Sequence, residues 1–369
     1  MHLHIVTLNI PFPPDYGGMI DTYYRIQALH DLGVRIHLHC FEYGRKHAKE
    51  LESLCETISY YKRNTGLNHH LSPKPYIVKS RQSSELLEDL TKDDYPVLFD
   101  GMHATSYLDH PLLSARKKII RLHNVEHKYY RSLVKSEHNL FKKIYFLIES
   151  AKLMHYEKIL NYADLLLPIS DKDLKYFSGR YQHSVLIPPF HPFTEIKSLP
   201  GIGEYIIYHG DLSVNENEAV CETLIKEVFS KIPHKCIIAG KDPSDFVKSL
   251  ALRYSNIRAI SNPDEKQMND LIANAQINLL PALSDNGFKL KLIMALYEGR
   301  YCIVNQVLGE NATIRSLCQV AGSSEEMIKM VTKLMNEPFT EEMIAIRKKQ
   351  LSESFDVIKN AQKLVDLIF

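Results

Sequence analysis

Short β-rich runs alternate with amphipathic stretches along the whole chain. Strands and helices in alternation are typical of βα units on a parallel sheet, so the sequence predicts an α/β protein. The expected strands of the first half are His4–Asn9, Val34–Phe41, Pro96–Asp100, Lys118–His123, Asp164–Ile169 and Ser184–Ile187. The expected helices there are Asp21–Leu32 and a long helix over His138–Tyr162.

A second βα series follows a break in this pattern. Four prolines and two glycines fall within residues 187–203, so neither a helix nor a strand can run through this segment. Beyond it we expect strands at Glu204–His209, Lys235–Ala239, Asn256–Ser261, Gln276–Pro281 and Tyr301–Asn305, and a helical stretch at Glu341–Phe369. The sequence therefore predicts two Rossmann-like lobes, 1–186 and 204–350, a linker over 187–203, and a C-terminal helix over 351–369 that could cross back to the first lobe.

The long expected helix carries both an apolar stripe and a local excess of positive charge. Between Pro111 and Leu160 there are eleven basic and four acidic residues, an excess of +7, with aromatic residues interleaved. Such a surface could bind anionic lipid or a lipid-diphosphate acceptor, through Lys128, Arg131, Lys142 and Lys143. The alternative is a solvated helix face above a core stripe made of Leu140, Ile144, Leu147, Ile148 and Ala151.

Composition narrows the class of protein. The 369 residues are 45% hydrophobic and 24% charged, as in a globular protein of about two domains. Lys+Arg of 45 against Asp+Glu of 44 leaves +1, so no global field favours nucleic acid as a partner. Six scattered cysteines without a C-x-x-C pair suit reduced thiols, and no signal peptide or membrane-spanning run is recognisable. We expect a cytoplasmic protein, with attachment to the inner face of the membrane left open.

Two loops at the ends of expected strands are candidate anion sites. The first, Pro11–Gly18, enters a helix with adjacent glycines, which lets a phosphate approach backbone N–H groups; the alternative is a turn that needs positive φ. In the second, Gly287 precedes a helix whose first turn holds Lys289 and Lys291. Cations are unfavourable at a helix N-terminus, so we expect a bound anion there; the alternative is a solvated basic turn.

The run from Asn286 to Gly299 resembles the E-G-F-G-L-x-x-x-E-A-M-A-x-G signature of family 4 GT-B glycosyltransferases. Similar matches, in the same order, cover nearly the whole chain: the P-x-x-Y-G-G loop at 13–18, Arg121–Asn124, Ala163–Asp171 and Tyr208–Ala219. The resemblance implies a GT-B fold with two Rossmann-like lobes facing a cleft. It also implies a retaining, metal-independent transfer of sugar from a UDP- or GDP-linked donor, without a cofactor.

The sequence departs from that family where two glutamates are expected, at Asn286 and Met294. The methionine cannot accept a ribose hydroxyl, and the family's usual arginine in the loop after Gly210 is not visible. We expect Lys289 and Lys291 to replace the missing positive charge. The expected donor-binding residues are Gly17, Gly18, Gly210, Lys241, Asn286, Gly287, Phe288, Lys289 and Lys291.

His123, at the end of an expected strand, aligns with the family's catalytic histidine, and His103 is the neighbouring alternative. The leading hypothesis is a retaining glycosyltransferase acting on a glycan or lipid-linked acceptor in surface polysaccharide synthesis. The lost glutamates leave two alternatives open: a non-catalytic GT-B binding or assembly protein, and a sugar-nucleotide epimerase. No motif for a metal site is found.

Overall fold

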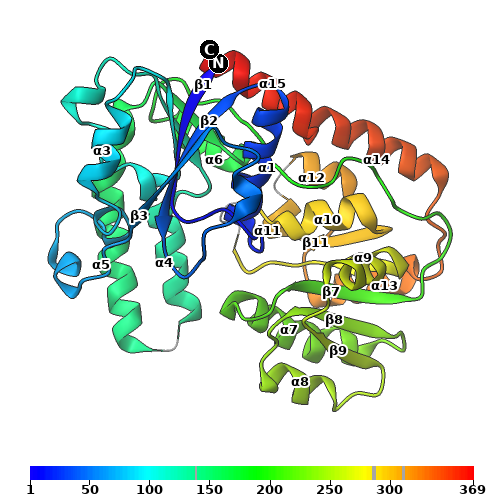
Figure 1. Ribbon diagram of the computed structural model, residues 1–369. Helices are drawn as coiled ribbons and strands as arrows, with labels where there is room; N and C mark the ends of the chain where they lie inside the picture. Colours follow the sequence, from blue (N-terminus) through cyan, green and yellow to red (C-terminus); the bar gives the residue numbers. More distant parts are fainter. Residues whose placement is uncertain (138, 285–287, 310–311) are drawn as a thin grey trace. The chain divides into compact units, whose positions relative to one another are not determined.

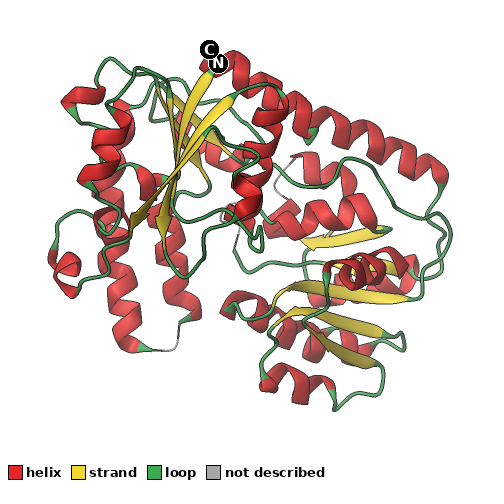
Figure 2. Ribbon diagram, in the orientation of Figure 1, coloured by secondary structure: helices red, strands yellow, loops and turns green. Residues whose placement is uncertain are grey.

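The structure is a computed structural model that describes residues 1–369 apart from 138, 285–287 and 310–311, and without the side chains of 67, 68, 136, 312 and 313. The chain forms two compact units. The first holds Met1–Pro192 and Phe355–Phe369, and the second holds most of the chain between them. Each unit is a parallel sheet with helices on its faces, the layered α/β arrangement that the sequence predicts (Figure 2).

The first sheet has six parallel strands in the order β3-β2-β1-β4-β5-β6. Its strands are β1 (His2–Thr7), β2 (Arg35–Glu42), β3 (Thr57–Lys62), β4 (Val97–Asp100), β5 (Lys118–Leu122) and β6 (Leu165–Pro168). The strand predicted at Ser184–Ile187 is found only in part. The segment lies beside β6, where the N–H groups of Val185 and Ile187 donate to the carbonyls of Leu166 and Pro168, but it forms a bridge at Ser184 and no full strand. Two prolines follow at once, and the Ile187 carbonyl accepts a hydrogen bond from the side chain of Arg121.

Helices cover both faces of this sheet. They are α1 (Gly17–Asp31), α2 (Tyr76–Lys79), α3 (Ser84–Leu90), α4 (Glu126–Ser136), α5 (Leu140–Tyr156), α6 (Asp171–Ser178) and α15 (Val357–Ile368). The last helix packs against α1 and buries Ala361, Leu364, Val365 and Ile368, a spacing that places all four on one face. The expected helix over 138–162 is shorter: Asn139 caps α5, and a 3-10 helix follows it over Glu157–Tyr162.

The apolar stripe of α5 does not lie in the core. Leu140, Ile144 and Leu147 are 67%, 47% and 49% exposed, and Ile148 and Ala151 are exposed as well. The inner face of the helix instead uses Glu149, Ser150 and Leu153. The expectation of a stripe packed on the core is therefore wrong, since other residues of the same helix hold it to the sheet.

The second sheet also has six parallel strands, in the order β12-β11-β10-β7-β8-β9. Its strands are β7 (Tyr205–Asp211), β8 (Cys236–Lys241), β9 (Ile257–Ser261), β10 (Ala275–Leu279), β11 (Tyr301–Asn305) and β12 (Gln319–Ala321). The helices of this unit are α7 (Asn215–Glu227), α8 (Asp245–Ala251), α9 (Glu265–Asn274), α10 (Leu290–Glu298), α11 (Gln306–Gly309), α12 (Ala312–Leu317), α13 (Ser324–Leu334) and α14 (Glu341–Ser354). In both sheets the first strand of the unit is central, and the strand order reverses there, which creates a switch point at its carboxyl end.

Four histidines stack on one face of β1 and β2. His4 Nδ1 lies 2.7 Å from His39 Nε2, and His2 Nδ1 lies 2.9 Å from His37 Nε2. His39 Nδ1 lies 2.7 Å from the hydroxyl of Tyr61. Burial is the main cause that lowers the pKa of His39 to about 3, and burial also lowers the pKa of His4 and His37. Burial therefore favours the neutral form of His4, His37 and His39 in the folded unit.

Candidate active site

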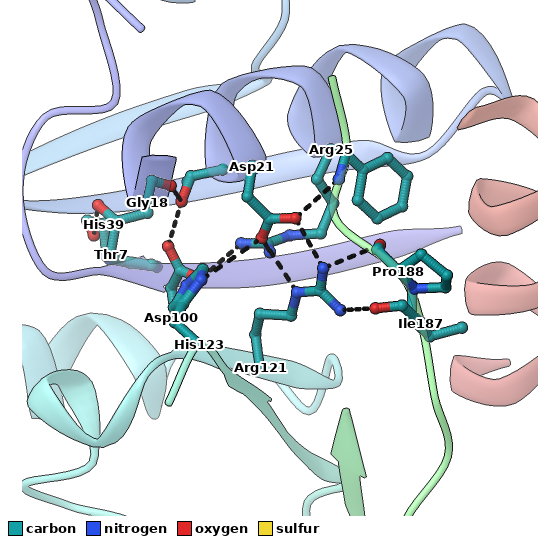
Figure 3. A network of polar contacts seen from close by, with 12 residues as sticks. Thr7, Gly18, Asp21, Arg25, His39, Asp100, Arg121, His123, Ile187 and Pro188 are labelled. Atoms are coloured by element: carbon teal, nitrogen blue, oxygen red, sulfur yellow. Dashed lines mark hydrogen bonds and ion pairs between the residues drawn. The ribbon is translucent and has the colours of Figure 1, made fainter. Parts of the chain in front are cut away.

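A buried ion-pair network lies at the carboxyl ends of β4 and β5 in the first unit (Figure 3). Helix α1 supplies Asp21 and Arg25 one turn apart, β4 ends in Asp100, and β5 contributes Arg121. Arg25 donates to Asp21 Oδ2 and to Asp100 Oδ1, both at 2.7 Å. Arg121 donates to the two oxygens of Asp21 at 3.0 and 2.6 Å, so one carboxylate joins both guanidinium groups.

The network also forms hydrogen bonds with the segment that follows β6. Arg121 donates to the carbonyl oxygens of Ile187 and Pro188, and the backbone N–H of Phe190 donates to Asp21 Oδ1 at 2.8 Å. Burial disfavours the charged form of both carboxylates. The attraction of the neighbouring guanidinium groups is stronger, and it holds the pKa of Asp21 and of Asp100 below the ordinary range. Two carboxylates balanced by two guanidinium groups give a rigid, neutral platform.

His123 contacts both carboxylates of this network. Its Nε2 lies 3.0 Å from Asp100 Oδ1 and its Nδ1 lies 3.9 Å from Asp21 Oδ2, while 13% of its side chain is exposed. Asp21, Asp100 and His123 could each offer one ligand atom to a cation. Both carboxylates already form ion pairs with Arg25 or Arg121, however, so their negative charge is neutralised. The arrangement orients an imidazole better than it attracts a metal ion.

His103 and Glu126 lie beside His123. Gly101 has φ of 81°, and a Cβ there would meet His103 Nδ1 at 3.3 Å and His123 Cδ2 at 3.8 Å, so this glycine makes room for both rings. His103 Nδ1 is buried and has no hydrogen-bond partner among the described residues. Burial is the main cause that raises the pKa of Glu126, at the first turn of α4, to about 7. A neutral imidazole and a titratable carboxyl thus flank His123.

The start of α1 is an uncapped helix N-terminus. Tyr16 is the N-cap and makes no side-chain capping hydrogen bond. Neither Gly17 nor Gly18 has a positive φ, so the alternative of a turn that requires left-handed glycines is wrong. Arg45 fixes the preceding loop by donating to the Pro13 carbonyl at 2.6 Å. The first N–H groups of α1 are therefore not used by a side-chain cap, and they carry the positive end of the helix dipole.

In the second unit, Lys291 reaches the carboxyl end of the central strand β7. Its Nζ donates to the Tyr208 hydroxyl and to Asn217 Oδ1, both at 3.0 Å. A Cβ on Gly210 would lie 3.6 Å from this Nζ, so the ammonium group sits directly over the strand end. Burial, followed by the charge of Lys289, lowers the pKa of Lys291 to about 8. The structure thus brings Gly210 and Lys291 together at the switch point of the sheet.

His209, which precedes Gly210, adds an unsatisfied polar atom there. The side chain is 2% exposed, and its Nε2 has no hydrogen-bond partner among the described residues. Burial, and then the charge of Lys291, lowers the pKa of His209 to about 3. A Cβ on Gly240 in β8 would lie 1.8 Å from the Gly210 carbonyl oxygen, so the backbones need a glycine here.

The remaining expected donor-binding residues are dispersed. Lys289 Nζ lies 3.4 Å from Glu216 Oε1, which also accepts from the Ser284 N–H at 3.0 Å. Lys241 ends β8 and is exposed. The ring of Phe288 lies 5.4 Å from that of Phe355. Asn286 and Gly287 lie outside the described residues, while Met294 is half-buried against the apolar cluster beneath α10.

The expected basic surface is formed by α4 and α5 of the first unit. Lys128, Arg131 and Lys142 are exposed, and Lys143 is half-buried. Lys128 lies over the ring of Tyr176, with Nζ 4.2 Å from its centroid. Lys142 Nζ lies 4.0 Å from Glu137 Oε2.

The sequence reasoning missed Asp21, Arg25, Asp100 and Arg121 as a group. Their signal was present: Arg121 interrupts an apolar strand, and Asp21 and Arg25 have the i, i+4 spacing of a helical ion pair. His209 was likewise missed, although it ends the apolar run before Gly210.

Solved structures with this architecture identify the fold. Sucrose-phosphate synthase from Thermosynechococcus elongatus aligns with 100% of this chain and 98% of its own, at a TM-score of 0.72 and 15% identity. HepE from Anabaena, in complex with UDP and glucose, aligns with 100% and 99%, at 0.66 and 14%. WaaG, a glycosyltransferase involved in lipopolysaccharide biosynthesis, aligns with 99% of each chain, at 0.63 and 14%. The chain has the GT-B fold.

Sequence relatives add little to the GT-B assignment. No family model matches the chain. A protein of Klebsiella pneumoniae described as an uncharacterized 44.6 kDa protein in the cps region is 26% identical over 328 residues, 84% of each chain. The resemblance to family 4, and the replacement of its glutamates at Asn286 and Met294, therefore stay predictions. A GT-B fold hosts several activities, so function has to be argued from the residues of this chain.

Proposed function

We propose that this protein is a retaining glycosyltransferase that moves a sugar from a UDP- or GDP-linked donor to a glycan or lipid-linked acceptor. The observation that carries the proposal is the half-buried ammonium group of Lys291, which Tyr208 and Asn217 hold over the end of β7. A positive charge held at a switch point suits an anion such as a diphosphate. The GT-B fold makes a nucleotide diphosphate the natural anion.

The donor's diphosphate would be bound by Lys291, with Lys289 in the same helical turn. In the free protein, burial disfavours the charged form of Lys291, and its two hydrogen bonds go to the neutral groups of Tyr208 and Asn217. A diphosphate would restore the counter-charge. As the bond from the anomeric carbon to the diphosphate breaks, negative charge grows on the departing oxygens, and a preorganised ammonium group stabilises it. The acceptor oxygen bonds to the anomeric carbon, and its proton leaves with the diphosphate.

The catalytic residue in this proposal is His123, beside the transferred sugar. We expect His123→Ala to lower kcat at least about tenfold while changing donor affinity little, because a group that acts on the transition state is not needed to hold the nucleotide. Steady-state kinetics and a separate UDP or GDP titration measure the two effects. Near-normal turnover in the variant would make His123 a structural histidine and leave His103 as the next candidate.

We further propose that the transfer needs no divalent ion. In this proposal, lysine side chains and helix N–H groups stabilise the negative charge of the leaving diphosphate. Asp21 and Asp100, which could otherwise hold a cation, are already paired with arginines. Activity should therefore persist in excess EDTA. Loss of transfer that added Mn²⁺ or Mg²⁺ restores would contradict this assignment.

Surface polysaccharide synthesis on the cytoplasmic side of the membrane is the context that we propose. The support is the Klebsiella relative described as lying in a cps region, and the similarity in fold to WaaG. Both likenesses suit a glycan or lipid-linked acceptor.

The experiment is a panel of UDP- and GDP-sugars incubated with the protein and candidate acceptors, with release of UDP or GDP and formation of glycan both followed. The proposal predicts transfer, or slow donor hydrolysis without an acceptor, for one donor. An isomeric nucleotide-sugar as the product would identify an epimerase instead. Nucleotide binding without turnover would identify a non-catalytic binding protein.

A further inference from the structure

Helix α5 presents an apolar face to solvent. Phe141 is 83% exposed and Met154 is 61% exposed, and the residues between them on the same face are exposed as well. Leu140, Ile144, Leu147, Ala151 and Met154 follow one another at intervals of four, three, four and three residues, which places them in one continuous stripe along the helix. A surface helix normally has the opposite orientation, with its apolar side in the core.

This orientation is fixed by the contacts of the inner face. Glu149 accepts from the Tyr76 N–H at 2.7 Å and from Lys152 at 2.9 Å, and the Ser150 hydroxyl donates to the His127 carbonyl at 2.7 Å. Rotating the helix to bury its stripe would break these hydrogen bonds and expose Leu153, which is fully buried. The exposed stripe is therefore a stable property of the first unit.

On α4 and α5, the charged side chains exposed to solvent are basic, and the acidic side chains are not exposed. Between residues 126 and 158 the exposed charged side chains of the described residues are all basic: Lys128, Arg131, Lys135, Lys142 and Lys158. The acidic side chains of that range are all buried or half-buried: Glu126, Glu137, Glu149 and Glu157. The surface around the stripe is therefore positive, although the chain as a whole carries only +1.

We propose that the exposed face of α5 binds to the surface of an anionic lipid membrane, with the stripe inserted among the acyl chains and the basic residues against the headgroups. No helix among the described residues is long and apolar enough to cross a membrane, so the contact is peripheral. The end of α4 and the start of α5 lie beyond the carboxyl ends of the strands of the first sheet (Figure 1). A second copy of the chain would instead bring lysines against lysines, which disfavours pairing through this face.

The test is co-sedimentation of the full chain with phosphatidylcholine vesicles that contain or lack phosphatidylglycerol. We expect binding only to the anionic vesicles, weakening as NaCl rises. Phe141→Ser with Leu147→Ser should weaken binding at least about tenfold, because two apolar insertions are lost. Lys142→Glu with Lys143→Glu should also weaken it at least about tenfold, since each basic residue near the surface contributes roughly fivefold.

Matched control variants exist elsewhere in the chain. Leu252→Ser with Ile346→Ser replaces side chains that are 85% and 49% exposed, like Phe141 and Leu147, and should bind as the wild type does. Lys348→Glu with Lys349→Glu should reduce binding much less than the α5 pair. Thermal melting of each variant establishes that its fold is intact.

Three results would overturn the proposal. The first is wild-type protein that stays in the supernatant with anionic vesicles, and the second is α5 variants that bind as tightly as the controls. The third is a concentration-dependent dimer in sedimentation velocity that Phe141→Ser with Leu147→Ser abolishes, without vesicle binding. Neither readout involves a nucleotide, so this inference and the proposed function can fail separately.

Discussion

Replacing Arg121 by methionine should lower the free energy of unfolding by about 3–5 kcal/mol, the usual cost of removing one partner from a buried ion pair. The guanidinium group is fully buried, and its hydrogen bonds join α1, β5 and the segment after β6. Methionine fills part of the space but leaves Asp21 with a single guanidinium partner and two carbonyl groups without theirs. Urea unfolding measures the change.

The matched control is Arg35→Met, because Arg35 is an exposed arginine in a strand of the same sheet. It should change stability by no more than about 0.5 kcal/mol. The double variant with Asp21→Asn should be less damaging than the sum of the two single changes, since each removes part of the same interaction. A loss below about 1 kcal/mol in Arg121→Met would contradict the description of this network as the platform of the site.

Unfolding should become easier as the pH falls below about 6.5, the ordinary pKa of histidine. Burial lowers the pKa of His39 to about 3 in the folded protein, so between those two values the unfolded chain binds the proton and the folded chain does not. The stability that this neutral histidine contributes is present above pH 6.5 and is lost as the pH falls toward 3. The expected slope from His39 alone is about 1.4 kcal/mol per pH unit.

Other groups act on the same pH window. His209, with a pKa lowered to about 3, adds to the slope, while Glu126 and Asp173, with pKa values raised to about 7 and about 6, act against it. The comparison between wild type and His39→Gln removes these contributions, because both proteins share them. We expect a slope shallower by about 1.4 kcal/mol per pH unit in His39→Gln than in the wild type. Parallel curves for wild type and His39→Gln would contradict the prediction.

Local sequence patterns predict the frame of the fold well, because each βα unit carries its own periodicity and turn residues. The strand at Tyr301–Asn305 is found with the predicted bounds, and both sheets are parallel. The short β12 and the half-buried β3 escaped prediction because neither is a clear apolar run. The strand expected at Ser184–Ile187 is reduced to a bridge beside β6, because two prolines follow it and Arg121, 66 residues away in sequence, takes the carbonyl of Ile187.

The candidate site depends more on contacts between distant residues. Lys291 was predicted from its place at a helix start, yet its partners Tyr208 and Asn217 lie 83 and 74 residues earlier in the chain. The four-residue ion-pair network was not predicted for the same reason, since its members come from α1, β4 and β5. The orientation of α5 could not be read from its periodicity, because a stripe shows which residues share a face and not whether that face is covered.

The central claim is that the second unit binds a nucleotide diphosphate through Lys291, and calorimetric titration with UDP and GDP tests it most directly. Lys291→Met keeps the apolar stem and removes the ammonium group with its two hydrogen bonds, and Lys226→Met on α7 is an exposed control. Wild type and control should bind one nucleotide, and Lys291→Met should bind it at least about tenfold more weakly, because a charge-assisted contact is worth roughly 1.5–3 kcal/mol. Lys289→Ala should weaken binding in the same direction. Equal affinity in wild type and Lys291→Met, or no nucleotide binding by the wild type, would contradict the claim.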